Sequence, residues 1–111
     1  MPLMSIETNQ ELENDDILSS LSRSIATLLS KPESYLMLKY EHNSNMLFAG
    51  TNQPLAHIKI KSLGLDEEKT ESFSKILCEL MQQHFSISVD RIYIEFANPD
   101  RHMWGWNSST F

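Results

Sequence analysis

The sequence contains little of several residue types that mark whole classes of protein. Cys78 is the only cysteine among the 111 residues, so no disulfide framework and no thiolate metal site is expected. Nine lysines and arginines stand against 15 aspartates and glutamates, which gives a net charge of −6 at pH 7. This acidic balance, with no basic run, argues against nucleic acid as a partner. No apolar run is long enough to cross a bilayer, so membrane insertion is not expected.

Other absences narrow the chemistry and the location. With only three glycines, the chain has no glycine-rich phosphate loop, and it has no nucleophile elbow. Its four histidines show no metal-ligand spacing, so we predict no metal. Residues 7–16 are polar and acidic, unlike a signal peptide. We therefore expect a cytoplasmic protein of one domain, residues 1–111, and leave open its release without a signal peptide.

An internal repeat organises the chain. Residues 2–7 are echoed by residues 54–59, and residues 34–40 by residues 90–96. A helical pattern lies between the members of each half. We interpret the chain as two copies of one strand–helix–strand unit.

Hydrophobic periodicity places the elements of each copy. Strands are expected at 3–7, 35–40, 56–62 and 91–96, with candidate short strands at 46–49 and 104–107. Asn14 or Asp15 can cap the first helix, and Pro32 is expected to stop it. Asp66 can cap the second helix. The pattern predicts an α+β fold, in which two βαβ repeats form a four-stranded mixed sheet with two helices on one face.

The two faces of the predicted sheet differ in character. The face toward the helices carries aliphatic side chains: Met4, Ile6, Leu36, Leu38, Ile58, Ile60, Ile92 and Ile94. The opposite face mixes polar and apolar ones: Leu3, Ser5, Met37, Lys39, His57, Lys59, Tyr93 and Glu95. Since that face is too polar for a second core and too apolar to be left in water, an oligomer whose sheets surround a central space would fit.

Pro2 is the first candidate for chemistry. If Met1 is removed, Pro2 becomes a secondary amine at the chain end, and burial or a nearby cation lowers the pKa of such an amine. A base with a pKa near neutral pH is what proton-transfer chemistry requires. The alternative is a rigid residue that opens an edge strand, where the missing N–H does no harm. Pro2 alone favours that alternative.

Three charged or polar side chains also have two interpretations. Lys31 can complement the C-terminus of the first helix, or it can lower the pKa of the Pro2 amine and bind a substrate carboxylate. Tyr93 is either a surface residue that covers a seam between subunits or a hydrogen-bond donor in a cleft. Glu95 is either a solvated strand residue or a carboxylate of the site.

The C-terminal tail is rich in aromatic residues, namely Trp104, Trp106 and Phe111. Aromatic tails usually anchor packing or an interface. The alternative is that the three rings wall a pocket for an aromatic substrate.

Five short segments, spread from the first residue to the last, match one known family in order and at family spacing. They are Met1-Pro2, Lys-Pro-Glu-Ser-Tyr at 31–35, Ser-Leu-Gly at 62–64, Asp-Arg-Ile-Tyr-Ile at 90–94, and Gly-Trp-Asn-Ser-Ser-Thr-Phe at 105–111. On these segments the chain resembles the macrophage migration inhibitory factor family of the tautomerase superfamily. The strand at 90–94 and the tail at 105–111 are strong evidence together.

The resemblance implies a tautomerase-like βαβ–βαβ protomer in a homotrimer, with sites at the subunit boundaries. It also implies keto–enol tautomerase activity on small aromatic α-keto acids such as phenylpyruvate and on dopachrome-like compounds, without a cofactor. By position, Pro2 would be the base that moves a proton between carbon and oxygen. Lys31 and the backbone N–H of Leu63 would hold the substrate carboxylate.

The remaining site positions include two departures from the family. By resemblance, Tyr93 from the neighbouring subunit would hydrogen-bond the substrate, and Trp106 and Phe111 would help wall the apolar pocket. Glu95 stands where animal members have asparagine. A carboxylate there would raise the pKa of the Pro2 amine and repel an acidic substrate. Trp104 stands where a smaller aliphatic residue is familiar, which would narrow the pocket.

The resemblance leaves more than one function open. The first is a tautomerase that uses Pro2, and the second is a cytokine-like signalling protein that binds a host cell-surface receptor. Catalysis requires a free Pro2 nitrogen, whereas binding tolerates a retained Met1. A trimer with neither role is a third interpretation. Leu55 and Ile58 replace the Cys-x-x-Cys of some members, so the thiol-oxidoreductase activity attributed to those members is not expected.

Overall fold

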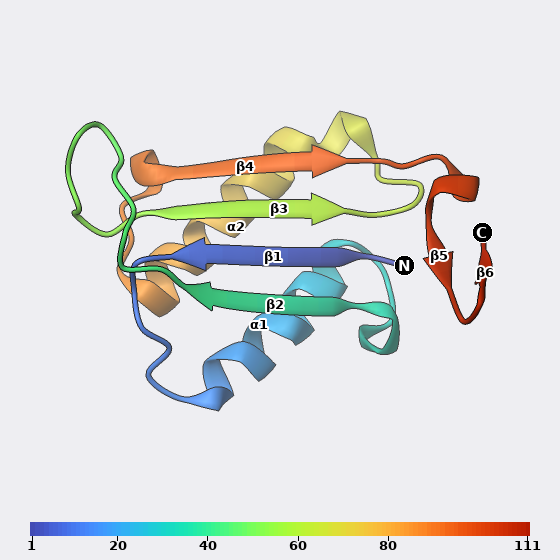
Figure 1. Cartoon of the computed structure of the whole chain (residues 1–111), viewed down its shortest axis with the longest axis horizontal. Helices are drawn as coiled ribbons and strands as arrows, with labels where there is room; N and C mark the ends of the chain where they lie inside the picture. Colours follow the sequence, from blue (N-terminus) through green and yellow to red (C-terminus); the bar gives the residue numbers. More distant parts are fainter.

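A computed structural model describes every residue, Met1–Phe111, and shows the predicted α+β fold. Two helices cover one face of a four-stranded mixed sheet (Figure 1). The main elements are β1 (Leu3–Thr8), α1 (Asp15–Leu28), β2 (Met37–His42), β3 (Ala56–Lys61), α2 (Thr70–Phe85) and β4 (Ile92–Ala97). A small hairpin follows, made of β5 (Gly105–Trp106) and β6 (Ser109–Thr110).

The sheet confirms the internal repeat. Its strand order is β2-β1-β3-β4, with β1 parallel to β2 and β3 parallel to β4. The two βαβ units meet where β1 pairs antiparallel with β3, and in that register Leu3 lies opposite Lys61. Pro2 therefore precedes a central strand, and the edge-strand alternative is wrong. Its missing N–H is tolerated at the start of the strand, where its carbonyl accepts a hydrogen bond from Met37 N–H at 3.0 Å.

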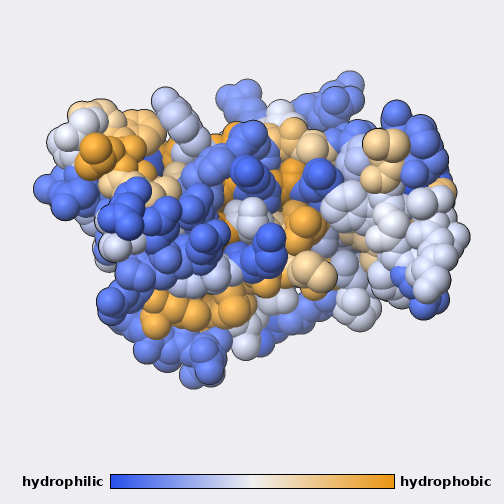
Figure 2. Space-filling model, in the orientation of Figure 1, coloured by the Kyte–Doolittle hydropathy of each residue, from blue (hydrophilic) through white to orange (hydrophobic).

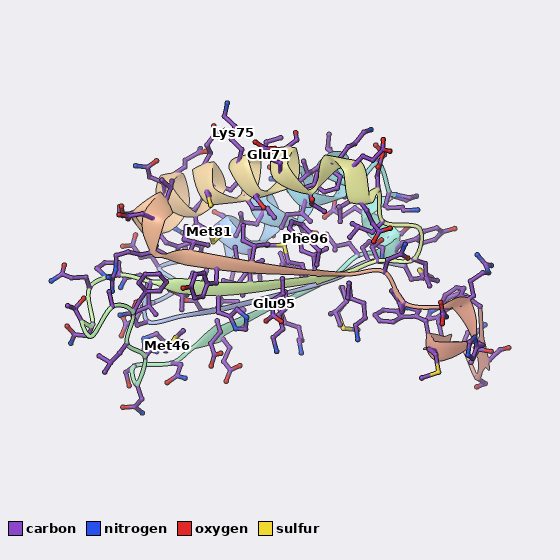
Figure 3. All side chains as sticks on the ribbon, turned by 90° about the horizontal axis from the view of Figure 1, so that it is seen from above. Met46, Glu71, Lys75, Met81, Glu95 and Phe96 are labelled. Carbon is purple, nitrogen blue, oxygen red and sulfur yellow. The ribbon has the colours of Figure 1, made fainter.

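The core lies between the helices and the sheet. The sheet contributes Met4, Ile6, Ile58 and Ile60, and the helices contribute Leu21, Ile25, Phe73, Leu77, Met81 and Phe85, all of them buried. Figure 3 shows Met81 between α2 and the sheet, whereas Glu95 projects from the other side of the sheet. The period-2 pattern of the strands and the helical period of α1 and α2 thus bring their apolar sides to one layer.

The predicted cap of the first helix is confirmed, whereas Asp66 caps a 3₁₀ turn that precedes the second helix and not that helix itself. The Asn14 side chain accepts a hydrogen bond from Ile17 N–H at 3.2 Å. The Asp66 side chain accepts one from Glu68 N–H at 3.1 Å, in a short 3₁₀ turn over Glu67–Lys69 that leads into α2. Asn14 thus satisfies a donor that the first turn of α1 leaves free, whereas Lys69, at the N-cap of α2, makes no side-chain capping bond.

The end of α1 differs from the prediction. The helix ends at Leu28, before Pro32, because Ser30 adopts a left-handed conformation with φ +54°. Ser30 N–H donates to Thr27 O at 3.1 Å and Lys31 N–H donates to Ala26 O at 3.0 Å. This pair of bonds closes the helix and turns the chain sharply. Lys31 consequently lies past the helix instead of in its last turn.

The start of the second strand was predicted two residues early. Residues Glu33–Tyr35 form a 3₁₀ turn, in which Tyr35 N–H donates to Pro32 O at 3.0 Å. Strand β2 begins only at Met37, where pairing with β1 becomes available. The apolar run that predicted a strand from residue 35 thus begins inside this turn. The turn is set by its backbone hydrogen bonds, which hydropathy does not reveal.

The two candidate short strands were wrong in detail. Residues 46–49 form no strand, and only an isolated bridge joins Phe48 to Thr51. The tail forms the β5–β6 hairpin instead of one strand, because Asn107 and Ser108 both take positive φ angles. Two such residues are what a tight two-residue hairpin turn requires.

The face of the sheet away from the helices is open in the single chain. Figure 2 shows this face as mostly hydrophilic, with apolar groups among the polar ones. Met37 and Tyr93 are among its exposed large side chains. Neither helix is both long and apolar enough to cross a membrane.

Leu77 tests the assigned core, since its side chain is 0% exposed between α2 and the sheet. We expect Leu77→Ala to lower the free energy of unfolding by about 2–5 kcal/mol, because it leaves a cavity that the core fills only partly. Ile76→Ala is the matched control: Ile76 is next in sequence but 37% exposed, and its loss is expected to be below about 1 kcal/mol. Urea unfolding of both variants measures the difference, and equal losses would contradict the assigned faces of α2.

Candidate active site

A pocket of about 890 Å³ lies at the end of the sheet where the chain begins. Its walls come from four places: the chain start, the α1–β2 connection, the turn after β3, and the segment after β4 with its hairpin (Figure 1). Of the candidate residues, Lys31, Leu63, Trp106 and Phe111 line it together with Met1. The pocket thus gathers groups from distant parts of the sequence at the chain start, although Pro2 itself is not among its lining residues.

The turn after β3 presents a free backbone donor. Leu65 N–H donates to Ser62 O at 3.2 Å, and Gly64 has φ +70°, which a type II turn requires at its third residue. Gly64 N–H is held by Asn98 Oδ1 at 3.0 Å. Leu63 N–H makes no hydrogen bond within the chain. A free N–H in a pocket wall is suited to an acceptor oxygen of a ligand.

Lys31 supplies the pocket with a positive charge. The structure has two ion pairs, His57 with Glu95 and Lys69 with Asp66, so the Lys31 ammonium is not neutralised by a carboxylate of its own chain. The left-handed turn at Ser30 directs the chain away from α1 at this point. An unpaired ammonium in a half-open pocket is suited to an anionic ligand group.

The amine at the chain start lies in the same place. Burial lowers the pKa of the Met1 amine below its ordinary value, and the positive charge of Lys31 lowers it further. Pro2 is fully buried behind it. An amine at this end of the sheet is therefore held in a setting that favours its neutral, basic form.

The hairpin forms the aromatic wall of the pocket. The rings of Trp106 and Phe111 stack almost parallel, 6° apart with centroids separated by 6.2 Å. Trp106 is 59% exposed, so one side of the wall is uncovered in the single chain. Trp104 is turned toward Lys61, whose ammonium lies 5.4 Å from its ring centroid.

Tyr93 and Glu95 do not line this pocket in their own chain. Tyr93 pairs with His57 at the start of β4, whereas the pocket adjoins the far end of β3, beyond Lys61. The four-residue separation of His57 and Lys61 corresponds to roughly 13 Å along the strand. Glu95 lies on the open face, where its carboxylate bonds the His57 ring.

The sequence analysis missed the contribution of Tyr35 and of the whole segment 98–101, which includes the charged residues Asp100 and Arg101, to the pocket lining. Asn98 fixes the Leu63 turn through Gly64, and Arg101 donates from Nε to Phe111 O at 3.2 Å, which ties the end of the chain to the pocket rim. The Asn-Pro pair at 98–99 is a turn signal after a strand, but its partner is far away in sequence. No group of three or more histidine, cysteine, aspartate or glutamate side chains is placed to hold a metal ion.

The arrangement combines three chemical capacities. A cation and a free N–H are suited to a carboxylate, stacked rings are suited to an apolar group, and the chain-terminal amine is a base. Such a site can bind an aromatic acid and move a proton on it.

The chain has full-length relatives. A family model described as macrophage migration inhibitory factor (MIF) matches residues 1–111. The mouse macrophage migration inhibitory factor is 32% identical over 114 residues, covering 100% of this chain and 99% of the relative. A homologue from Trichuris trichiura is 35% identical and is covered completely, as is this chain.

Solved structures agree with the fold. A macrophage migration inhibitory factor homologue from Prochlorococcus marinus has a TM-score of 0.90 at 37% identity, covering 98% of both chains. The factor from Trichinella spiralis has a TM-score of 0.92 at 28% identity, covering 98% of this chain and 99% of its own. The family match and these relatives both span essentially the whole length, so the chain belongs to the macrophage migration inhibitory factor family.

Proposed function

We propose that this protein is a keto–enol tautomerase that acts on phenylpyruvate-like α-keto acids and on dopachrome-like compounds, with Pro2 as the base. The observation that carries the proposal is the convergence of Lys31, the free N–H of Leu63 and the chain start in one pocket with an aromatic wall. Membership of the family supports it. The substrate class is the one that the family resemblance implies, and the pocket's pairing of cationic and aromatic groups supports it.

In the proposed mechanism the substrate carboxylate lies against Lys31 and Leu63 N–H, and its ring lies against Trp106 and Phe111. The unprotonated Pro2 nitrogen removes a proton from the carbon next to the keto group. The electrons of that C–H bond form the carbon–carbon double bond, and those of the C=O bond move onto the keto oxygen. The protonated Pro2 amine then gives its proton to that oxygen, which yields the enol and restores the free amine. Fixed donors stabilise the charge that develops on that oxygen. The steps run equally in reverse.

We further propose that the working site needs a neighbouring copy of the chain, in a trimer. Tyr93 is 67% exposed at the end of the sheet opposite to its own pocket, and one flank of the aromatic wall is uncovered. A second copy that covers the open face can bring its Tyr93 and Glu95 to that flank. Tyr93 would then donate a hydrogen bond to the substrate.

A cytokine-like signalling role, through a host cell-surface receptor, is the second candidate. The observation that favours it is the name of the full-length mouse relative, a macrophage migration inhibitory factor, at 32% identity. The two roles make different demands on the chain start, because receptor binding does not need a free Pro2 nitrogen. Protein that retains Met1 distinguishes the two roles, because it should still bind a receptor but should not catalyse.

The chain start gives the first test of the catalytic proposal. Protein that begins at Pro2, checked by mass spectrometry, is expected to tautomerise phenylpyruvate, whereas protein that retains Met1 is expected to be inactive because its Pro2 nitrogen is an amide. Pro2→Gly, processed in the same way, is expected to lose roughly 10²- to 10⁴-fold in kcat/KM. Full activity of protein that retains Met1 would contradict the role of Pro2.

Lys31 gives the second test. Lys31→Gln is expected to raise KM for phenylpyruvate roughly ten- to hundredfold, because it removes a charged partner of the carboxylate. The activity should rise with pH as the amine loses its proton, and the midpoint should move to higher pH in this variant, since the lowering effect of the cation is gone. Lys75→Gln is the control, because Lys75 projects from α2 away from the sheet (Figure 3). Equal effects of the two variants would exclude a direct role for Lys31.

Glu95 gives the third test, since it departs from the residue that the family resemblance suggests. Glu95→Gln is expected to lower KM for phenylpyruvate by roughly two- to tenfold and to move the pH midpoint down, because a negative charge near the amine and the substrate is removed. Steady-state kinetics from pH 5 to 9 would show both changes. Unchanged KM and midpoint would place Glu95 outside the site.

A further inference from the structure

A row of three side chains in contact joins the loop after β2 to Tyr93. The Arg91 guanidinium carbon lies 5.2 Å from the centroid of the Phe48 ring, and the Phe48 ring lies 5.0 Å from that of Tyr93, tilted by 60°. We infer that Phe48, held in place by Arg91, is a positioning residue that orients Tyr93 toward the site of a neighbouring copy. The effect on catalysis rests on the proposed function, whereas the contact between Phe48 and Tyr93 is independent of it.

Arg91 fixes the loop by hydrogen bonds to its backbone. Its Nε donates to Pro54 O at 3.0 Å and its Nη1 donates to Phe48 O at 3.1 Å. Its Nη2 donates to Thr51 O at 3.2 Å and to Gln53 O at 3.1 Å. The guanidinium has no carboxylate partner, so carbonyl oxygens alone satisfy it. The planar fork of donors suits this task, which a lysine could not perform.

The loop is held by Arg91 and, toward its end, by Asn9, whose Nδ2 donates to Asn52 O at 2.9 Å and whose Oδ1 accepts from Leu55 N–H at 3.1 Å. It contains no strand, and within it the backbone makes only the bridge between Phe48 and Thr51, with N···O distances of 3.0 and 3.1 Å. Ala49 and Gly50, which lie between them, both have positive φ angles, so the turn is tight. Arg91 therefore fixes a turn whose first residue is the aromatic partner of Tyr93.

Phe48 is the aromatic neighbour of Tyr93. Tyr93 is 67% exposed and stands on the open face at the start of β4, where a strand tyrosine can populate more than one χ1 rotamer. The phenol makes no hydrogen bond inside its own chain. Packing against Phe48 favours one ring orientation before a substrate arrives, which reduces the entropy that binding must remove.

The position of Arg91, Phe48 and Tyr93 in the fold shows which pocket Tyr93 can reach. The loop lies at the end of the sheet opposite to the chain start, beside the beginning of β4 (Figure 1). Tyr93 therefore cannot serve its own pocket, and any substrate it contacts is held by another copy. Arg91 and Phe48 would influence that substrate only through Tyr93, so their loss should weaken binding and leave the base untouched.

A double-mutant cycle tests the inference on protein that begins at Pro2. Phe48→Leu removes the ring but keeps an apolar side chain, and we expect it to raise KM for phenylpyruvate roughly two- to tenfold with kcat and the pH midpoint nearly unchanged. Tyr93→Phe removes the hydroxyl. If Phe48 acts through Tyr93, adding Phe48→Leu to Tyr93→Phe should raise KM little further.

Two further variants separate positioning from folding. Phe48→Tyr keeps an aromatic ring and should restore the low KM, whereas a merely structural role would show itself as lower thermal stability with unchanged KM. Leu47→Ala is the matched control, because Leu47 is adjacent on the same loop and 71% exposed. It should change neither KM nor stability.

A measurement on the free protein keeps this inference distinct from the proposed function. Tyrosine labelling gives NMR couplings that report the χ1 rotamer of Tyr93, and only Tyr35 and Tyr40 need to be told apart from it. We expect one rotamer in the parent and averaged couplings in Phe48→Leu. Unchanged couplings, or a KM effect fully additive with Tyr93→Phe, would overturn the inference. An inactive parent would overturn the proposed function while the couplings still decide the positioning role.

Discussion

The antiparallel pairing of β1 with β3 is the constraint on which the rest of the structure depends. It joins two βαβ units at the centre of the sheet, and its inward side chains, Met4, Ile6, Ile58 and Ile60, form the floor of the core. A slip of one residue would turn all of these side chains to the other face, so burial specifies the register strongly. With Leu3 opposite Lys61, the start of β1 meets the end of β3, and Pro2 comes to lie beside the turn that contains Leu63.

The same pairing separates the groups that the proposed reaction requires. Strand β4 runs parallel to β3, so its start, with Tyr93, lies at the end of the sheet away from the pocket. One chain therefore carries the end with Lys31 and Leu63, proposed to bind a carboxylate, and an end with Tyr93, and the two ends cannot meet within it. An open sheet face of mixed polarity lies between them (Figure 2). This geometry explains why a site at a boundary between copies is the natural proposal, and why the loop clamped by Arg91 acts at a distance from its own pocket.

Electrostatics in this protein is local and does not follow from the total charge. The chain carries a net charge of −6, yet its pocket presents the unpaired ammonium of Lys31 and a free N–H from Leu63. Burial and that ammonium together lower the pKa of the amine at the chain start. An acidic protein can thus offer a cationic pocket to an acidic ligand, because neighbouring groups and burial outweigh distant surface charges that water and salt screen.

The two-copy pattern, the strand and helix faces and the Asn14 cap could be predicted from the residues alone, because hydrophobic period and side-chain capping are local properties. The sequence also singled out Pro2, Lys31 and Leu63, through family resemblance more than through physics. The end of α1 at Leu28 and the hairpin of the tail emerged only in three dimensions, since positive φ angles at serine and asparagine leave no clear signal in hydropathy. Only the folded chain joins Asn98 to the Leu63 turn and Arg91 to Phe48, because those partners are far apart in sequence and strand pairing brings them together.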